Sequence, residues 1–187
     1  MKKELLPSVL LTILCIVLFS AVYPGVIWAI AQLSPNKGNG TMIATNKGQQ
    51  YANIAQSFTR DEYFWPRPSA VNYNAAGSGG SNKGPDNKEY LAVIQQRIDT
   101  FLVHNPGVKR PDIPSELVTA SGSGLDPDIS YQAALIQVQR IARRRNMPDN
   151  VIRSLVDNNY QQPLFGLFGP RKVNVLALNI ALDNASK

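Results

Sequence analysis

One glycine-rich loop has a composition that could bind phosphate. It runs from Gly77 to Gly84 and contains one lysine, Lys83. A nucleotide-binding P-loop needs a glycine, four residues, and then Gly-Lys-Ser or Gly-Lys-Thr, because backbone amides and the lysine surround the phosphates and the hydroxyl holds magnesium. Counted from Gly77, Asn82 replaces the second glycine and Gly84 replaces the hydroxyl residue. The loop therefore lacks two essential groups, and turns with left-handed backbone angles explain its glycines more simply.

Residues that carry acid-base, nucleophilic or metal chemistry are scarce. The chain has one histidine, His104, and one cysteine, Cys15. One histidine cannot build a His/Cys metal site, and a Ser-His-Asp set would depend on His104 alone. His104 is expected at the end of a helix, where its role is structural, and Cys15 lies within an apolar run, where it is a small packing residue. We predict no catalytic residue and no metal ligand.

A stiff aromatic segment is the better candidate for a functional surface. Residues 63–70 read Tyr-Phe-Trp-Pro-Arg-Pro-Ser-Ala. Two prolines hold the backbone extended, and Phe, Trp and Arg are common at interface hot spots. The alternative interpretation is a core plug or a plain structural turn. We predict a partner interface formed by this segment and the glycine loop, with the residues Phe64, Trp65, Arg67, Pro68, Ser69, Gly79, Gly80, Ser81 and Asn82.

The N-terminal part of the chain predicts a membrane helix. Residues 5–33 contain no charged side chain, and about 20 apolar residues are enough to cross a bilayer core of about 30 Å. Tyr23 and Trp28, near the far end, are aromatic residues of the kind found at the membrane interface. The sequence therefore predicts a transmembrane helix over 5–33, with Tyr23 and Trp28 in contact with the lipid interface.

The residues beside this span predict its orientation. Lys2 and Lys3 precede it, and positive charge close to a first span is retained on the cytoplasmic side. We therefore expect residues 1–4 in the cytoplasm and the remaining chain outside it. Cleavage of a signal peptide after Ala31 is the alternative, since Ala29 and Ala31 are small. However, the apolar region is much longer than the signal core of about 7 to 15 residues.

The rest of the chain predicts one domain outside the cytoplasm. Residues 34–46 are rich in Pro, Gly and Asn and form a linker. Residues 47–187 are enough for one α+β domain with its own core, which the single cysteine leaves without an internal disulfide. The net charge of +6 is spread over the chain apart from Arg143 to Arg145, and the basic residues do not alternate with aromatic ones. Nucleic acid is therefore excluded as a partner.

Apolar periodicity predicts four helices in this domain. The first is capped by Asp86 or Asn87 and ends at Asn105-Pro106-Gly107. The second begins at Ser130 and ends with the three arginines, where cations favour the helix dipole. The third starts at Pro148, and the fourth follows Asn174. The side chains expected to face inward from the first helix are Leu91, Ile94, Ile98, Phe101 and Leu102.

Two short strands complete the prediction. One is expected with a turn between Ile43 and Phe58, and Ile54, Phe58 and Phe64 are expected to supply apolar side chains to the core. The other is expected at Glu116 to Thr119, before the small-residue turn that follows it.

Four short motifs occur in an order that resembles one family. They are Phe64 with Arg67–Ala70, Gly77–Asn82, Glu116–Asp126, and Val173–Val175 with Asn179–Asp183. Together with the single N-terminal span, they resemble the KdpC subunits of Kdp potassium-transporting P-type ATPases over nearly the whole chain. The sequence departs from the family pattern at Lys83 and at Gln161-Gln162-Pro163, which affects the local surface.

The resemblance implies an accessory subunit in the bacterial inner membrane. Its partners would be a channel-like potassium subunit, a P-type ATPase subunit that carries the phosphorylated aspartate, and a very small helical subunit. The family is described as needed for assembly and as a catalytic chaperone that raises the ATP affinity of the ATPase subunit. We expect no cofactor bound directly, with ATP present only at the level of the complex. A domain outside the cytoplasm cannot touch ATP inside, so we expect an indirect effect through the helix and partners.

Two other functions remain open. The chain could be a membrane-tethered binding module or sensor without a pump partner, or a secreted enzyme released by cleavage after Ala31. Recovery in a stable complex with large polytopic subunits would support the pump subunit. Recovery as a free monomer would support the binding module, and a new N-terminus after Ala31 would support the secreted enzyme.

Overall fold

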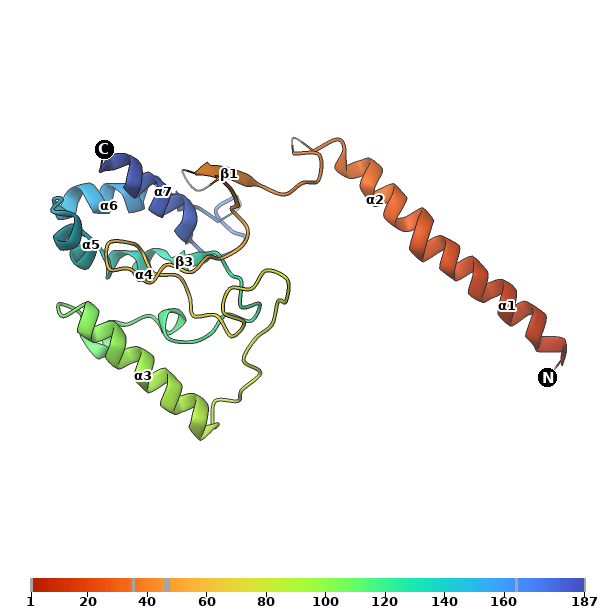
Figure 1. Cartoon of the computed structure of the whole chain (residues 1–187), viewed down its shortest axis with the longest axis horizontal. Helices are drawn as coiled ribbons and strands as arrows, with labels where there is room; N and C mark the ends of the chain where they lie inside the picture. The colour runs from red at the N-terminus through yellow and green to blue at the C-terminus, as the bar shows by residue number, and fades with distance from the viewer. Residues whose placement is uncertain (1, 35, 46–47, 164, 187) are drawn as a thin grey trace. The chain divides into compact units, whose positions relative to one another are not determined.

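The chain divides into two compact units, Met1–Met42 and Ile43–Lys187. The structure is a computed structural model that describes residues 2–34, 36–45, 48–163 and 165–186 (Figure 1). Each unit is built on its own apolar pattern.

The first unit is a nearly continuous apolar helix. It consists of α1 (Lys2–Val17), the π-helical segment η1 (Leu18–Val22) and α2 (Tyr23–Ala31). Pro24 has no N–H to donate to the preceding turn, and the helix widens just before it, where the N–H of Tyr23 donates to the carbonyl of Leu18. Within Glu4–Ala31, the most apolar window of 18 residues has a mean hydropathy of 2.6, which suits a membrane span. The predicted helix is confirmed, although it ends at Ala31 instead of Leu33.

The second unit contains five α-helices among its described residues. Asn87 caps the first of them, as predicted, by accepting a hydrogen bond from the Tyr90 N–H at 2.9 Å. Ser130 and Asn174 cap two others in the same way. The helices are α3 (Lys88–His104), α4 (Tyr131–Leu135), α5 (Val138–Arg145), α6 (Asp149–Asn158) and α7 (Val175–Ala185).

Short strands form two small sheets in the part of the domain that the structure describes. β1 (Met42–Thr45) and β2 (Gly48–Tyr51) form a two-stranded sheet in the region where a strand and turn were predicted. A second, antiparallel sheet has the order β3–β5–β4, and Val173 at its centre pairs with Ile129 on one side and Tyr160 on the other. Its strands are β3 (Asp128–Ser130), β4 (Tyr160–Gln161) and β5 (Lys172–Asn174). The second unit is therefore an α+β domain, as predicted.

The core lies between this sheet and helices α4 to α7. In Figure 1, α3 lies across the domain from α5, α6 and α7, with irregular segments between them. Phe64 belongs to one of those segments and is fully buried. The other large apolar side chains with almost no exposed surface are Ile141, Ile152, Val156, Val173, Leu178 and Leu182. These helices and the aromatic segment thus share one apolar core.

The strand predicted at Glu116 to Thr119 is wrong. These residues belong mainly to the 3₁₀ turn η3 (Ser115–Leu117), which follows Pro114. The Leu117 N–H donates to the Pro114 carbonyl at 3.0 Å, and the consecutive side chains of Leu117 and Val118 are both buried. A half-buried strand would alternate the two faces, so the apolar pair fits a turn better.

Two details of the predicted helices are also corrected. The helix after Ser130 breaks into α4 and α5 because the buried Gln137 side chain accepts from the Trp65 N–H at 2.8 Å and donates to the Ala133 carbonyl at 3.0 Å. Leu91 was expected to face inward from α3 but is 47% exposed, and Phe101 is the one fully buried residue of that helix. Another short 3₁₀ turn, η2 (Arg110–Asp112), follows α3.

Candidate functional site

The aromatic segment is anchored in the domain by side-chain amides. The Asn179 amide binds the N–H and the carbonyl of Phe64, at 2.8 and 3.0 Å. Gln137 holds the backbone of Trp65 in the same way. Since Phe64 itself has no exposed surface, any part it has in a partner interface is indirect: it fixes the half-exposed Trp65 beside it.

Arg67 turns back toward its own domain. Its Nη1 lies 2.8 Å from Oδ2 of Asp126, with 25% and 33% of the two side chains exposed. The Nε atom is buried and has no hydrogen-bond partner within the described residues. The ion pair therefore leaves part of the guanidinium donor set unused.

The two halves of the predicted interface meet at a third loop. The Ser121 N–H donates to the Pro68 carbonyl at 3.1 Å, and the Gly79 N–H donates to the Ser123 carbonyl at 2.8 Å. A Cβ on Gly80 would lie 2.9 Å from the Gly122 carbonyl oxygen, so glycine is required for this approach. Residues 121–124 thus bring Pro68 and the glycine loop together.

The remaining predicted interface residues lie around this contact. Ser69 Oγ accepts from the Tyr73 N–H at 2.9 Å and so shapes the local turn. Ser81 is half-buried, whereas Asn82 is exposed with a left-handed φ of 52°. The predicted membrane-interface residues Tyr23 and Trp28 are 60% and 67% exposed on α2.

A second polar cluster joins α3 to α5. Arg140 is buried, and its guanidinium lies 4.6 Å from the Trp65 ring centroid. It donates from Nε to Asn105 Oδ1 at 3.0 Å and from Nη2 to Gln137 Oε1 at 2.6 Å, and Nη1 binds the carbonyls of Asp61 and Tyr63. Burial lowers the pKa of Arg140 to about 10, so it remains charged at neutral pH.

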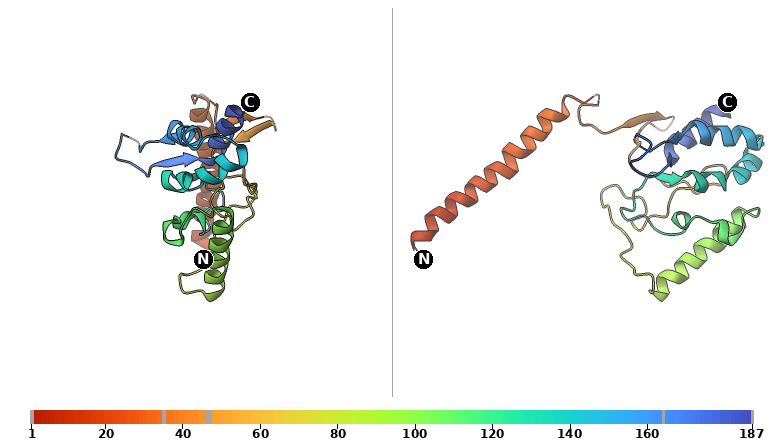
Figure 2. Two further views of the ribbon diagram at one scale, coloured as in Figure 1. Left: turned by 90° about the vertical axis from the view of Figure 1, so that its left-hand side faces the viewer. Right: turned by 180° about the vertical axis from the view of Figure 1, so that it is seen from behind.

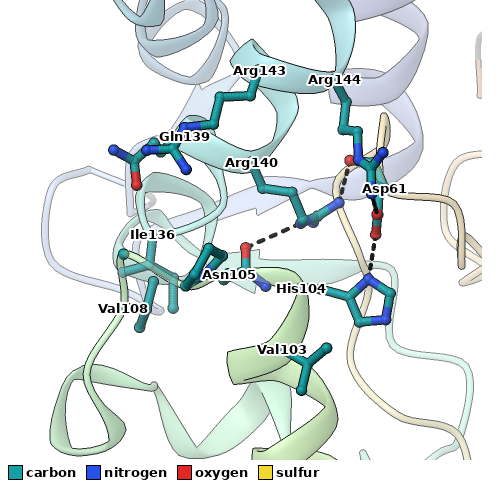
Figure 3. Close-up of a pocket in the computed structure, with 12 residues that line it drawn as sticks. Asp61, Val103, His104, Asn105, Val108, Ile136, Gln139, Arg140, Arg143 and Arg144 are labelled. Carbon is teal, nitrogen blue, oxygen red and sulfur yellow. Dashed lines mark hydrogen bonds and ion pairs between the residues drawn. The ribbon is translucent and has the colours of Figure 1, made fainter.

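Asp61 is the carboxylate of this cluster. His104 Nδ1 lies 2.6 Å from its Oδ1, and Arg144 Nη2 lies 2.6 Å from its Oδ2. Burial would raise the pKa of the carboxyl group, but the hydrogen bonds and positive charges of His104 and Arg144 outweigh it and hold the pKa of Asp61 below its usual range. Figure 3 shows the three side chains converging from the loop, α3 and α5.

A pocket of about 480 Å³ opens beside this cluster. Arg140, Arg143 and Arg144 contribute to its wall from α5, and His104 contributes from α3 (Figure 3). The arginine run does lie in the last turn of α5, as predicted, but its members differ: Arg144 pairs with Asp61, Arg145 with Asp183, and Arg143 is exposed. The arginine side chains of the pocket can donate hydrogen bonds to a negatively charged group, and the pocket lining contains no hydroxyl or thiol nucleophile.

Comparison with known proteins identifies the family. The family model described as "KdpC: K+-transporting ATPase, c chain" matches residues 5–184. The chain belongs to the KdpC family. It is 52% identical to the potassium-transporting ATPase KdpC subunit of Flavobacterium psychrophilum over 97% of this chain and 98% of that protein. It is 50% identical to the KdpC subunit of Bacteroides fragilis and 42% identical to that of Caldanaerobacter subterraneus, each over 97% of this chain. The resemblance inferred from the short motifs is therefore confirmed.

Membership of the KdpC family indicates the kind of complex to which the chain belongs. A KdpC chain is a subunit of a potassium-transporting ATPase. The described part of this chain has one apolar helix long enough to cross a membrane, which fits a single-pass membrane protein. Three of the four motifs, at Phe64–Ala70, Gly77–Asn82 and Glu116–Asp126, are joined by the backbone contacts above. Sequence reasoning missed Asp61, Asn105 and Arg140, because single polar residues in loops and helices give no periodic signal.

Proposed function

We propose that this KdpC chain is a non-catalytic subunit needed to assemble an ATP-driven, high-affinity potassium uptake pump. The observation that carries the proposal is the full-length match, from span to last helix, to potassium-transporting ATPase subunits. The chemistry of the described residues supports it, since the lone histidine is bound to Asp61 and packs with its ring centroid 5.0 Å from that of Trp65. Such a histidine has no nucleophile to activate.

The proposed partners are a channel-like potassium subunit, a P-type ATPase subunit and a small helical subunit. The joined motif loops, with exposed parts of Trp65, Pro68 and Asn82, are the proposed contact surface. Stiff prolines and loop backbones pinned by hydrogen bonds lose little entropy on docking, which favours assembly.

The proposed orientation has the N-terminus in the cytoplasm and the domain outside it. From that side the chain acts as a catalytic chaperone only indirectly: it binds one conformational state of the pump better than another and thereby raises the ATP affinity of the hydrolysing subunit. In this orientation the domain makes no direct contact with ATP.

Purification of the native complex tests the assembly role. The full chain, tagged at its C-terminus and extracted in mild detergent, should bring down large polytopic membrane proteins that peptide sequencing identifies as the pump subunits. Recovery as a free monomer would instead support a membrane-tethered binding module or sensor. A mature N-terminus after Ala31 would support a secreted protein.

A further inference from the structure

The loop between β4 and β5 carries three large apolar side chains in solvent. Phe165 is 83% exposed, Leu167 is 81% exposed and Phe168 is 66% exposed. These three residues are called the hairpin tip below. Phe165 lies within a turn in which the Gly166 N–H donates to the Pro163 carbonyl at 2.8 Å, and Leu167 and Phe168 follow that turn. In the left-hand view of Figure 2 the blue hairpin projects well beyond the helices of the domain. Its side chains therefore face away from the domain's own core.

We propose that the hairpin tip inserts into the interfacial region of the lipid bilayer. Apolar and aromatic side chains partition into the boundary between headgroups and acyl chains, and cations beside them bind lipid phosphates. From Gln161 to Lys172 the chain has no acidic residue, and it ends in two basic ones. Lys172 is paired with Asp128 at 2.6 Å, whereas Arg171 is exposed and available to a phosphate.

The length of the linker keeps a bilayer within reach. Only residues 32–41 separate α2 from β1, and a chain of that length spans at most about 35 Å when fully extended. An anchored domain on so short a tether meets lipid at a high effective concentration, so even a weak contact is populated.

The size of the hairpin tip favours lipid over a protein as its occupant. Three side chains of this kind offer roughly 400 Å² of exposed apolar area, whereas each partner in a standard protein interface buries about 800 Å². A bilayer needs no complementary shape and can accept an isolated tip. This inference rests on the membrane span and is independent of the proposed role in assembly.

A fluorescent probe in vesicles tests the proposal. The full chain with Cys15→Ser and Leu167→Cys, labelled with an environment-sensitive NBD group, is reconstituted in phosphatidylcholine and phosphatidylglycerol vesicles. Lipids that carry a spin label near the headgroup should quench this probe at least about twofold more than a probe at Val103→Cys. Val103 is a matched control because it is apolar and 76% exposed on α3.

Two further variants separate lipid contact from other causes. Phe165→Ser with Phe168→Ser should remove at least about half of the quenching difference, and Arg171→Gln should weaken it mainly in vesicles with anionic lipid. Equal quenching at 167 and 103 in vesicles would overturn the proposal. Shielding of the 167 probe that occurs only in the complete pump, and not with the chain alone, would also overturn it and assign the hairpin tip to a protein partner.

Discussion

Arg140 donates from Nε to Oδ1 of Asn105 at 3.0 Å, and this bond ties α5 to the residue that ends α3. Asn105 is itself fixed, since its side-chain amide donates to the Phe101 carbonyl at 2.8 Å. The same guanidinium binds two carbonyls of the loop that precedes Trp65. One buried side chain thus positions three segments that are far apart in the sequence.

Loss of Arg140 should therefore destabilise the domain strongly. Arg140→Met removes the hydrogen bonds that Arg140 donates to Asn105, Gln137 and two carbonyls, and we expect the free energy of unfolding to fall by about 3 kcal/mol or more. This free energy is measured by unfolding the full chain with urea in detergent, with near-ultraviolet circular dichroism as the signal. The neighbouring exposed Arg143→Gln is the control and should change stability by less than about 0.5 kcal/mol. Equal effects of the two variants would refute the bracing role of Arg140.

The Asp61 cluster predicts a dependence of stability on pH. Because the pKa of Asp61 is held below its usual range in the folded chain, the carboxylate stabilises the fold at pH values above its unfolded pKa. That contribution is lost as the pH falls through the folded pKa, below about pH 4. Unfolding measured at pH 7 and at pH 3 should show a smaller drop in stability for Asp61→Asn than for the unchanged chain.

The exposed Asp86→Asn is the matched control for this titration and should show the same drop as the unchanged chain. If Asp61→Asn instead retains the full acid sensitivity, other carboxyl groups are responsible for it.

The single histidine should be dispensable for turnover. His104 is partly exposed and pairs with Asp61, and pairs of this kind contribute less than about 1 kcal/mol. His104→Gln should leave potassium-stimulated ATP hydrolysis by the assembled complex within about twofold, and the purified chain alone should hydrolyse no ATP. A tenfold loss in the folded variant would show that His104 takes part in catalysis.

The sequence predicted the helices better than the strand pairing and the tertiary contacts, for a physical reason. Caps at Asn87, Ser130 and Asn174 act over three or four residues, so their side chains reveal helix starts directly. The sheet β3–β5–β4 joins residues separated by up to 46 positions, and strands of two or three residues have no detectable period. Asp61 and Arg140 are likewise brought together only by the tertiary fold.

The orientation of the chain across the membrane can be tested at a solvent-exposed position. Ser123 is exposed in the loop that joins the motifs. With Cys15→Ser as background, Ser123→Cys should react with an impermeant thiol reagent added to cells whose outer membrane is permeabilised. Reaction only after lysis of the inner membrane would reverse the proposed orientation.

Arg67 provides the sharpest test of the proposed assembly surface, because two roles can be separated there. Arg67 can bind a partner subunit, or it can stabilise its own domain through the ion pair with Asp126. A partly exposed pair of this kind contributes up to about 1 kcal/mol, so Arg67→Ala should lower the thermal midpoint of the chain only slightly. If the guanidinium also binds a partner subunit, the same variant should weaken assembly by about 1 to 3 kcal/mol. Asp126→Asn breaks the ion pair but keeps the guanidinium, and we expect it to assemble nearly normally. Equal losses of assembly for both variants, each matched by a lower midpoint, would make Arg67 an internal brace, and the partner surface would then have to lie at the glycine loop, Gly77 to Gly84.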